Sequence, residues 1–181
     1  MEGDGSFVVG KKGLSFEITQ SYYDIDLLHN IAQVLGFGKV MHRQTTIGHG
    51  ATRLRHVGVY YVTGKINYLK LIQLVNDRLL TPAKQKQFSA WLNRFNHLYG
   101  YNIVAKSVDV NANISFDNAW LAGFIDAEGC FSARFYRCHT SKHGINLVQG
   151  FSVTQKSPDV LHHIKRLFSL HSKHKHVSYD S

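Results

Sequence analysis

Residues 120–131 read Trp-Leu-Ala-Gly-Phe-Ile-Asp-Ala-Glu-Gly-Cys-Phe, and this stretch decides the fold. Ala119, Gly123 and Ala127 recur every four residues, so they share one face of the helix that the stretch predicts. Small residues at this spacing let the backbone of another helix approach closely. The glycine after Glu128 is placed to end the helix. The stretch therefore predicts a helix-pairing segment that ends in a carboxylate.

The flanking residues give this helix a start and a core. Asp117 or Ser115 is predicted to cap its first turn, where backbone N–H groups lack partners within the helix. Leu121, Phe124 and Ile125 form the apolar remainder that fixes the helix in a core.

The beginning of the chain repeats the end of this stretch. Residues 2–5 read Glu-Gly-Asp-Gly, beside Asp-Ala-Glu-Gly at residues 126–129. A second shared block follows in each half, Phe-Glu-Ile-Thr-Gln at residues 16–20 and Phe-Ser-Val-Thr-Gln at residues 151–155. Internal repetition of this kind predicts two copies of one structural unit.

Matching acids, Asp4 and Glu128, stand at the end of the motif in the two copies. Two acidic groups held close repel each other unless a divalent cation neutralises them. Oxygen ligands with water suit Mg²⁺, and such an ion can activate water and stabilise the leaving oxygen of a phosphodiester. Glu128 by itself also fits a solvated carboxylate at a helix end, but the rest of the motif favours a metal ligand.

Residues 121–129 resemble, position by position, the LAGLIDADG motif of homing endonucleases, and two copies resemble the single-chain, pseudo-symmetric members. The resemblance implies an α+β fold of αββαββα half-units, with antiparallel saddle-shaped sheets backed by helices and a pseudo-twofold repeat. The predicted parts are residues 1–100 for the first half-unit, which lacks most of its motif helix, 101–116 for a linker, and 117–181 for an incomplete second half-unit. We expect a chain that is truncated at both ends.

The resemblance also implies a metal site. Asp4 and Glu128 would carry the divalent cation, expected to be Mg²⁺, together with the backbone carbonyls of Gly3 and Ala127.

Three further residues match positions that act beside the metals in the family. Gln20 and Gln155 match polar residues that order the water network, and Lys84 matches the active-site lysine, where a cation would stabilise charge on the scissile phosphate. Lys84 also fits a solvated residue in the first turn of a helix, although the helix dipole disfavours a cation there. The earlier acids, Glu2 and Asp126, match a position that is structural in the family.

Hydrophobic periodicity and turn residues predict the remaining elements. We expect hairpins over residues 6–20 and 39–62, helices over 24–35, ended at Gly36, and over 68–80, and a helix opened by Thr81-Pro82. That last helix is expected to bury a stripe made of Phe88, Trp91, Leu92, Phe95 and Leu98.

Alternation along the strands indicates which residues face outward. A two-stranded ribbon can enter the major groove of DNA and contact base edges, and arginine can pair with guanine or grip phosphate. The predicted DNA-contacting residues are Lys39, Arg43, Arg53, Arg55, Tyr61, Ser132, Arg134 and Tyr136. Phe131, Ala133 and Phe135 are predicted to face the core. Exposed strand faces are commonly basic or polar in any case, so the pattern alone also fits an ordinary solvated surface.

The composition agrees with a nucleic-acid partner. The chain has 181 residues, a formal net charge of +9 and a pI near 9.6, which favours a polyanion. Two cysteines are too few for a disulfide framework and favour a reducing compartment. No apolar run is long enough to span a membrane, so no membrane partner is expected. No secretory or transit segment is visible, which in this family is consistent with synthesis inside a mitochondrion or chloroplast.

The resemblance, supported by the paired acids and the positive charge, implies a site-specific double-strand DNA endonuclease, encoded by an intron, that acts by metal-assisted hydrolysis on a long target site. One alternative is an RNA maturase that assists group I intron splicing, with intron RNA as its partner. Another is a non-catalytic DNA-binding remnant. Because the small-residue face of the motif helix needs a partner, we also expect association with a complementary fragment or a second copy.

Overall fold

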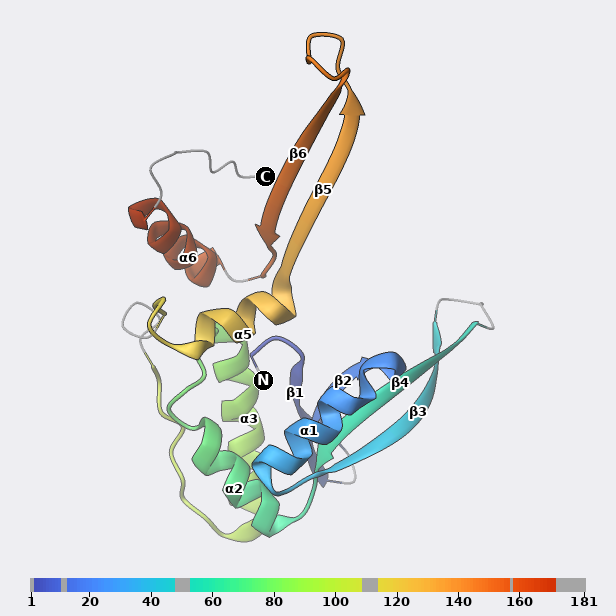
Figure 1. Cartoon of the computed structure of the whole chain (residues 1–181). Helices are drawn as coiled ribbons and strands as arrows, with labels where there is room; N and C mark the ends of the chain where they lie inside the picture. The colour runs from blue at the N-terminus through green and yellow to red at the C-terminus, as the bar shows by residue number, and fades with distance from the viewer. Residues whose placement is uncertain (1, 11–12, 48–52, 109–113, 157, 172–181) are drawn as a thin grey trace. The chain divides into compact units, whose positions relative to one another are not determined.

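The chain is described by a computed structural model that covers residues 2–10, 13–47, 53–108, 114–156 and 158–171 (Figure 1). It divides into two compact units, residues 1–108 and 109–181. Each unit combines an antiparallel sheet with helices, which confirms the predicted α+β class. No helix in the part of the chain that the structure describes is long and apolar enough to cross a membrane.

The first unit holds a four-stranded antiparallel sheet in the order β1-β2-β4-β3, together with the helices α1, α2 and α3 and a short 3-10 turn, Tyr22–Asp24 (Figure 1). Its elements are β1 (Gly5–Gly10), β2 (Gly13–Ser21), α1 (Ile25–Leu35), β3 (Lys39–Ile47), β4 (Arg53–Val62), α2 (Lys65–Val75) and α3 (Pro82–Tyr99). Both predicted hairpins are present, and α1 ends at Gly36, whose φ of 69° is the left-handed conformation that glycine tolerates.

One face of this sheet packs on the helices and forms the core. Phe16 in β2 and Tyr60 in β4 are fully buried, and Trp91 of α3 packs over the hairpin with its indole N–H donating to the Ser15 carbonyl at 2.9 Å. Leu98, predicted to belong to the buried stripe of α3, is 42% exposed, because the helix turns that position away from the sheet.

Helix α2 begins three residues before the predicted start and ends at Val75 rather than at residue 80. The end was predicted too late because Leu79 and Leu80, which are buried, continue the apolar pattern beyond the helix. Asn76 ends the helix. Its side-chain amide donates to the Val104 carbonyl at 3.0 Å, and its side-chain oxygen accepts from the Lys106 N–H at 2.9 Å.

Residues 101–108, within the range predicted as a linker, lie in the first unit. Tyr101, Ile103 and Ala105 alternate toward the core and are partly buried against it. Asn96 of α3 holds the segment through two hydrogen bonds with the backbone of Ile103, at 2.7 and 3.2 Å.

The second unit contains α5 (Ala119–Glu128), β5 (Gly129–Arg137), β6 (Ile145–Val153) and α6 (Pro158–His171), with β5 and β6 forming a two-stranded sheet. The predicted cap of α5 is wrong by at least one residue. Asn118 is the N-cap, and its side-chain oxygen accepts from the Trp120 N–H at 3.0 Å, whereas Ser115 accepts from the Asp117 N–H.

The β5–β6 ribbon differs from the prediction on its apolar face. Phe131 and Phe135 were expected to face the core but are 78% and 74% exposed. Phe131 contacts Phe151 with ring centroids 4.8 Å apart, much as Phe7 contacts Phe16 at 4.9 Å in the first unit. In the first unit α3 covers that pair, and no helix of the described residues covers Phe131 in the same way.

Candidate functional site

Asp4, Gln20 and Lys84 come together at one end of the first sheet. Gly5 of β1 pairs with Ile18 of β2, so the turn before β1 lies beside the end of β2. The Gln20 side-chain amide donates to Asp4 Oδ2 at 2.8 Å, and the Asp4 side chain remains exposed. The predicted acid and its predicted polar neighbour are therefore in direct contact.

Lys84 reaches the same turn from α3. Its ammonium group donates to the Gly5 carbonyl and, at 3.5 Å, to the Gly3 carbonyl. Lys84 is half-buried in the first turn of the helix. The structure thus places the predicted lysine against the two backbone carbonyls that flank Asp4.

Glu2, which the sequence assigned only a structural role, binds the start of α3. Its carboxylate accepts from the Leu80 N–H, from the Thr81 N–H at 3.2 Å and from the Thr81 hydroxyl at 2.6 Å. Thr81 is the N-cap residue of α3 as predicted, but its side chain does not bond to the helix N–H groups. Its hydroxyl is used to bind Glu2.

The second unit presents Glu128 at the end of α5, half-buried. The Glu128 backbone carbonyl accepts from the Thr154 N–H at 3.3 Å, which ties the end of the helix to the end of β6. Gln155 differs from its counterpart Gln20, because its side-chain oxygen accepts from the neighbouring Lys156 N–H at 2.8 Å. Ala119, Gly123 and Ala127 lie exposed along α5.

The exposed carboxylate of Asp4 is a ligand of the type that suits a hard divalent cation. Asp4 offers an exposed carboxylate with one oxygen already oriented by Gln20, and oxygen donors with water are what Mg²⁺ prefers. Among the described residues there is no group of three or more His, Cys, Asp and Glu side chains that could hold a metal ion.

The predicted basic residues of the first unit share the sheet face opposite the core. Lys39 pairs with Tyr61, and Arg55 pairs with Thr45, in the β3–β4 register. Core-facing Tyr60 and Val62 alternate with them on β4. Arg53 lies in β4 as well, but its side chain is outside the described part of the structure.

Glu17 on this face was not predicted to be a site residue. Arg43 reaches across β4 to Glu17, with a 3.3 Å separation between Nη1 and Oε2, and the Ser15 hydroxyl donates to the other Glu17 oxygen at 3.2 Å. The only signal in the sequence is that Glu17 alternates with Phe16 and Ile18, which face the core. Its carboxylate holds the Arg43 side chain along the sheet.

In the second unit Ser132, Arg134 and Tyr136 are exposed on β5, but Phe131, Ala133 and Phe135 are exposed as well, so exposure along β5 does not alternate. The Tyr136 hydroxyl accepts from the Asn146 side-chain amide across the ribbon at 3.5 Å. Both faces of the ribbon are open along its length.

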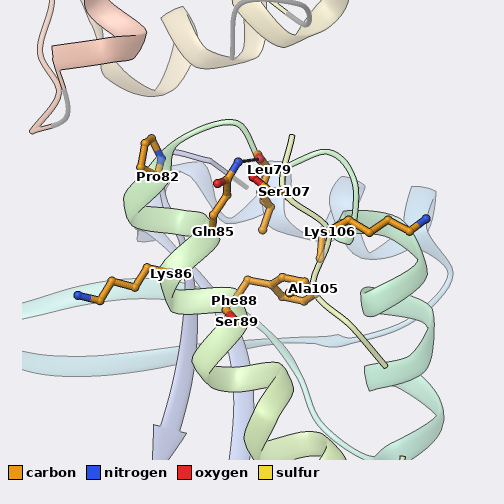
Figure 2. A pocket seen from close by; sticks show the side chains of 10 residues that line it. Leu79, Pro82, Gln85, Lys86, Phe88, Ser89, Ala105, Lys106 and Ser107 are labelled. Atoms are coloured by element: carbon orange, nitrogen blue, oxygen red, sulfur yellow. Dashed lines mark hydrogen bonds between the residues drawn. The ribbon is translucent and has the colours of Figure 1, made fainter. Parts of the chain in front are cut away.

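The first unit also contains a cavity of about 340 Å³ (Figure 2). Val75, Leu79 and Phe88 give it an apolar wall, and the Gln85 amide donates to the Leu79 carbonyl at 2.7 Å. Its lining includes none of Asp4, Gln20 and Lys84, so the cavity is not part of the candidate site.

Comparison with known proteins shows which proteins this chain is similar to. Residues 121–180 match the profile of the family described as LAGLIDADG endonuclease. "Probable intron-encoded endonuclease 4" of Neurospora crassa is 42% identical over 137 residues, which are 75% of this chain and 23% of that protein. "Probable intron-encoded endonuclease Cox1-I1b" of Schizosaccharomyces pombe is 26% identical, over 85% of this chain and 43% of that protein. The chain thus spans less than half the length of either relative.

Solved structures give the fold. The LAGLIDADG meganuclease I-AabMI bound to uncleaved DNA has a TM-score of 0.61 at 20% identity, covering 99% of this chain and 72% of that chain. Meganuclease I-SmaMI bound to uncleaveable DNA has a TM-score of 0.59 at 17% identity, covering 93% of this chain and 69% of that chain. Over residues 121–180 the chain matches the LAGLIDADG endonuclease family, and its fold is similar to that of the solved LAGLIDADG meganucleases.

Proposed function

We propose that this chain takes part in site-specific cleavage of double-stranded DNA by divalent-metal-assisted hydrolysis of the phosphodiester. The observation that carries the proposal is the convergence of Asp4, Gln20 and Lys84 at one end of the first sheet. Residues so distant in sequence meet here in the combination that phosphodiester hydrolysis needs: an exposed carboxylate, a polar group that orients it, and a cation.

Asp4 in the first unit and Glu128 in the second are the proposed metal ligands, and Mg²⁺ is the proposed cation. When bound, such an ion lowers the pKa of water and stabilises the leaving oxygen. Gln20 fixes the orientation of the Asp4 carboxylate through its 2.8 Å hydrogen bond. Lys84 supplies a positive charge beside Asp4, where it would stabilise the charge on a phosphate.

The basic sheet face of the first unit and the β5–β6 ribbon are the proposed DNA-contacting surfaces. Lys39, Arg55 and Tyr61 lie on the face turned away from the core. Solved relatives of the same fold are described as bound to DNA, and the net charge of +9 favours a polyanion. Because the curated relatives are named as intron-encoded, we propose an intron of the group I type in an organelle genome as the coding context.

A cleavage selection tests the proposal. The purified chain is incubated with a high-complexity duplex DNA library in Mg²⁺ or in EDTA, and newly formed ends are captured and sequenced. We expect one long site to be enriched in Mg²⁺ only. Asp4→Asn and Glu128→Gln should each lower cleavage of that site on the order of 10²-fold, whereas Asp26→Asn, on an exposed position of α1, should not.

Other outcomes identify the alternatives. Retention of one duplex sequence without new ends in Mg²⁺ would indicate a DNA-binding protein without catalysis. No selected duplex, together with acceleration of intron splicing by the added chain, would indicate a maturase. Either result would overturn the cleavage proposal.

A further inference from the structure

We propose that Glu2 is a positioning residue for Lys84, acting through Thr81; this inference rests on the proposed function. The sequence assigns Glu2 no role in the reaction, and its carboxylate bonds to Leu80 and Thr81. Its effect runs through the start of α3, which Glu2 fixes to the turn that carries Asp4.

The first link joins Glu2 to Thr81. Both carboxylate oxygens of Glu2 are used, one by the Leu80 N–H and the other by the Thr81 N–H and the Thr81 hydroxyl. Thr81 is only 2% exposed, so water cannot readily replace these partners. Hydrogen bonds to an ionised acceptor are roughly twice as strong as neutral ones.

The second link joins Thr81 to Lys84. The Thr81 carbonyl accepts from the backbone N–H groups of Lys84 and Gln85, both at 3.0 Å. All three polar groups of Thr81 are therefore engaged, two with Glu2 and one with the first turn of α3. A shift of Thr81 would move the Lys84 backbone with it.

The third link returns to the acidic turn. The Lys84 ammonium donates to the carbonyls of Gly3 and Gly5, the residues on either side of Asp4. Glu2, Thr81, Lys84 and this turn form a closed ring of contacts around Asp4. Opening the ring at Glu2 would free α3 to move Lys84 relative to the Asp4 carboxylate.

The negative charge of Glu2 is a second way in which this residue can act on Lys84. Lys84 stands in the first turn of α3, where the helix dipole opposes a positive charge. No acidic residue lies in that first turn, so the Glu2 carboxylate, which sits just ahead of the helix, is placed to offset the dipole. Glu2→Gln keeps the shape of the side chain and removes this charge.

A lysine-reactivity measurement on the full chain tests the inference without DNA or metal. Trace acetylation with acetic anhydride, followed by mass spectrometry, gives the rate at Lys84 relative to Lys86, which is exposed on the same helix. We expect Glu2→Gln and Thr81→Val to raise the Lys84 rate about tenfold, the equivalent of one lost hydrogen bond. The Lys86 rate should stay constant, and Thr81→Ser, which keeps the hydroxyl, should behave as wild type.

A cleavage measurement on the selected site then tests the consequence. Glu2→Gln should lower the single-turnover rate about tenfold while DNA affinity in Ca²⁺ stays unchanged, and Thr81→Ser should retain the wild-type rate. Unchanged Lys84 reactivity in Glu2→Gln would overturn the positioning role. A parallel rise at Lys86 would indicate general loosening of the fold and would also overturn it. A wild-type chain that never cleaves DNA would refute the proposed function, while the acetylation result would still decide the role of Glu2.

Discussion

At the scale of single residues, Gly38 shows how little room the loop between α1 and β3 leaves. Its φ is 86°, and a Cβ atom there would lie 2.5 Å from the Tyr60 ring. The ring cannot move aside cheaply, because Tyr60 is fully buried and its hydroxyl donates to the Phe37 carbonyl at 2.9 Å. Gly38→Ala should lower the free energy of unfolding by about 3 kcal/mol, from strain and overpacking together.

Gly36→Ala is the matched control, because Gly36 has φ 69° but nothing lies within 4 Å of the position that its Cβ atom would take. It should cost about 1 kcal/mol, from the backbone conformation alone. Urea denaturation of both variants gives the comparison. If Gly38→Ala and Gly36→Ala lose the same free energy of unfolding, contact with the Tyr60 ring does not contribute to the cost at Gly38.

Tyr60 should also make the free energy of unfolding depend on pH in the alkaline range. Burial raises the pKa of its hydroxyl to about 12 from the ordinary value of 10.0. Because the unfolded chain releases this proton near pH 10 and the folded chain only near pH 12, stability should fall as pH rises between these values. The loss from this residue is at most about 3 kcal/mol. Tyr60→Phe should show a smaller loss between about pH 9 and 11.5 in urea denaturation; the same loss as wild type would refute the assignment.

At the scale of elements, the two β-hairpins that follow the acids offer a matched pair of phenylalanines. Phe7 packs against Phe16, Phe88 and Trp91, whereas its counterpart Phe131 is 78% exposed. Phe7→Ala should cost about 3–5 kcal/mol as a core truncation, and Phe131→Ala less than about 1 kcal/mol. Hydrogen exchange of β1–β2 and β5–β6 peptides measures each hairpin separately. A large loss of protection in β5–β6 would show that Phe131 is covered in solution.

Element boundaries were predictable where a residue acts alone and not where it acts through a distant partner. Gly36 and Thr81-Pro82 mark helix limits by their own backbone preferences. The predicted end of α2 was wrong because the apolar periodicity continues through Leu79 and Leu80, which are buried in a loop rather than in a helix. Nothing in the local sequence shows that they leave the helix and still enter the core.

At the scale of the whole molecule, the α+β fold could be predicted because the residues of the motif are consecutive in the sequence. The resemblance nominated Asp4, Gln20 and Lys84, and the first unit brings them together. The contacts of Glu2 with Thr81 and of Glu17 with Arg43 could not be predicted. They depend on which strands and helices become neighbours, and neither pair has a distinctive spacing in the sequence.

The distribution of charge over the chain leads to a prediction about salt. If the basic sheet face contacts phosphates, the logarithm of the DNA association constant should fall linearly with the logarithm of salt concentration. Lys39→Ala and Arg55→Ala should each reduce that slope by about 1, since each removes one phosphate contact. Lys70→Ala is the control, because Lys70 lies on α2 with its ammonium 5.9 Å from the Phe37 ring. Fluorescence anisotropy with a labelled duplex at several salt concentrations measures the slopes, and a change with Lys70→Ala equal to that with Lys39→Ala would place the DNA elsewhere on the molecule.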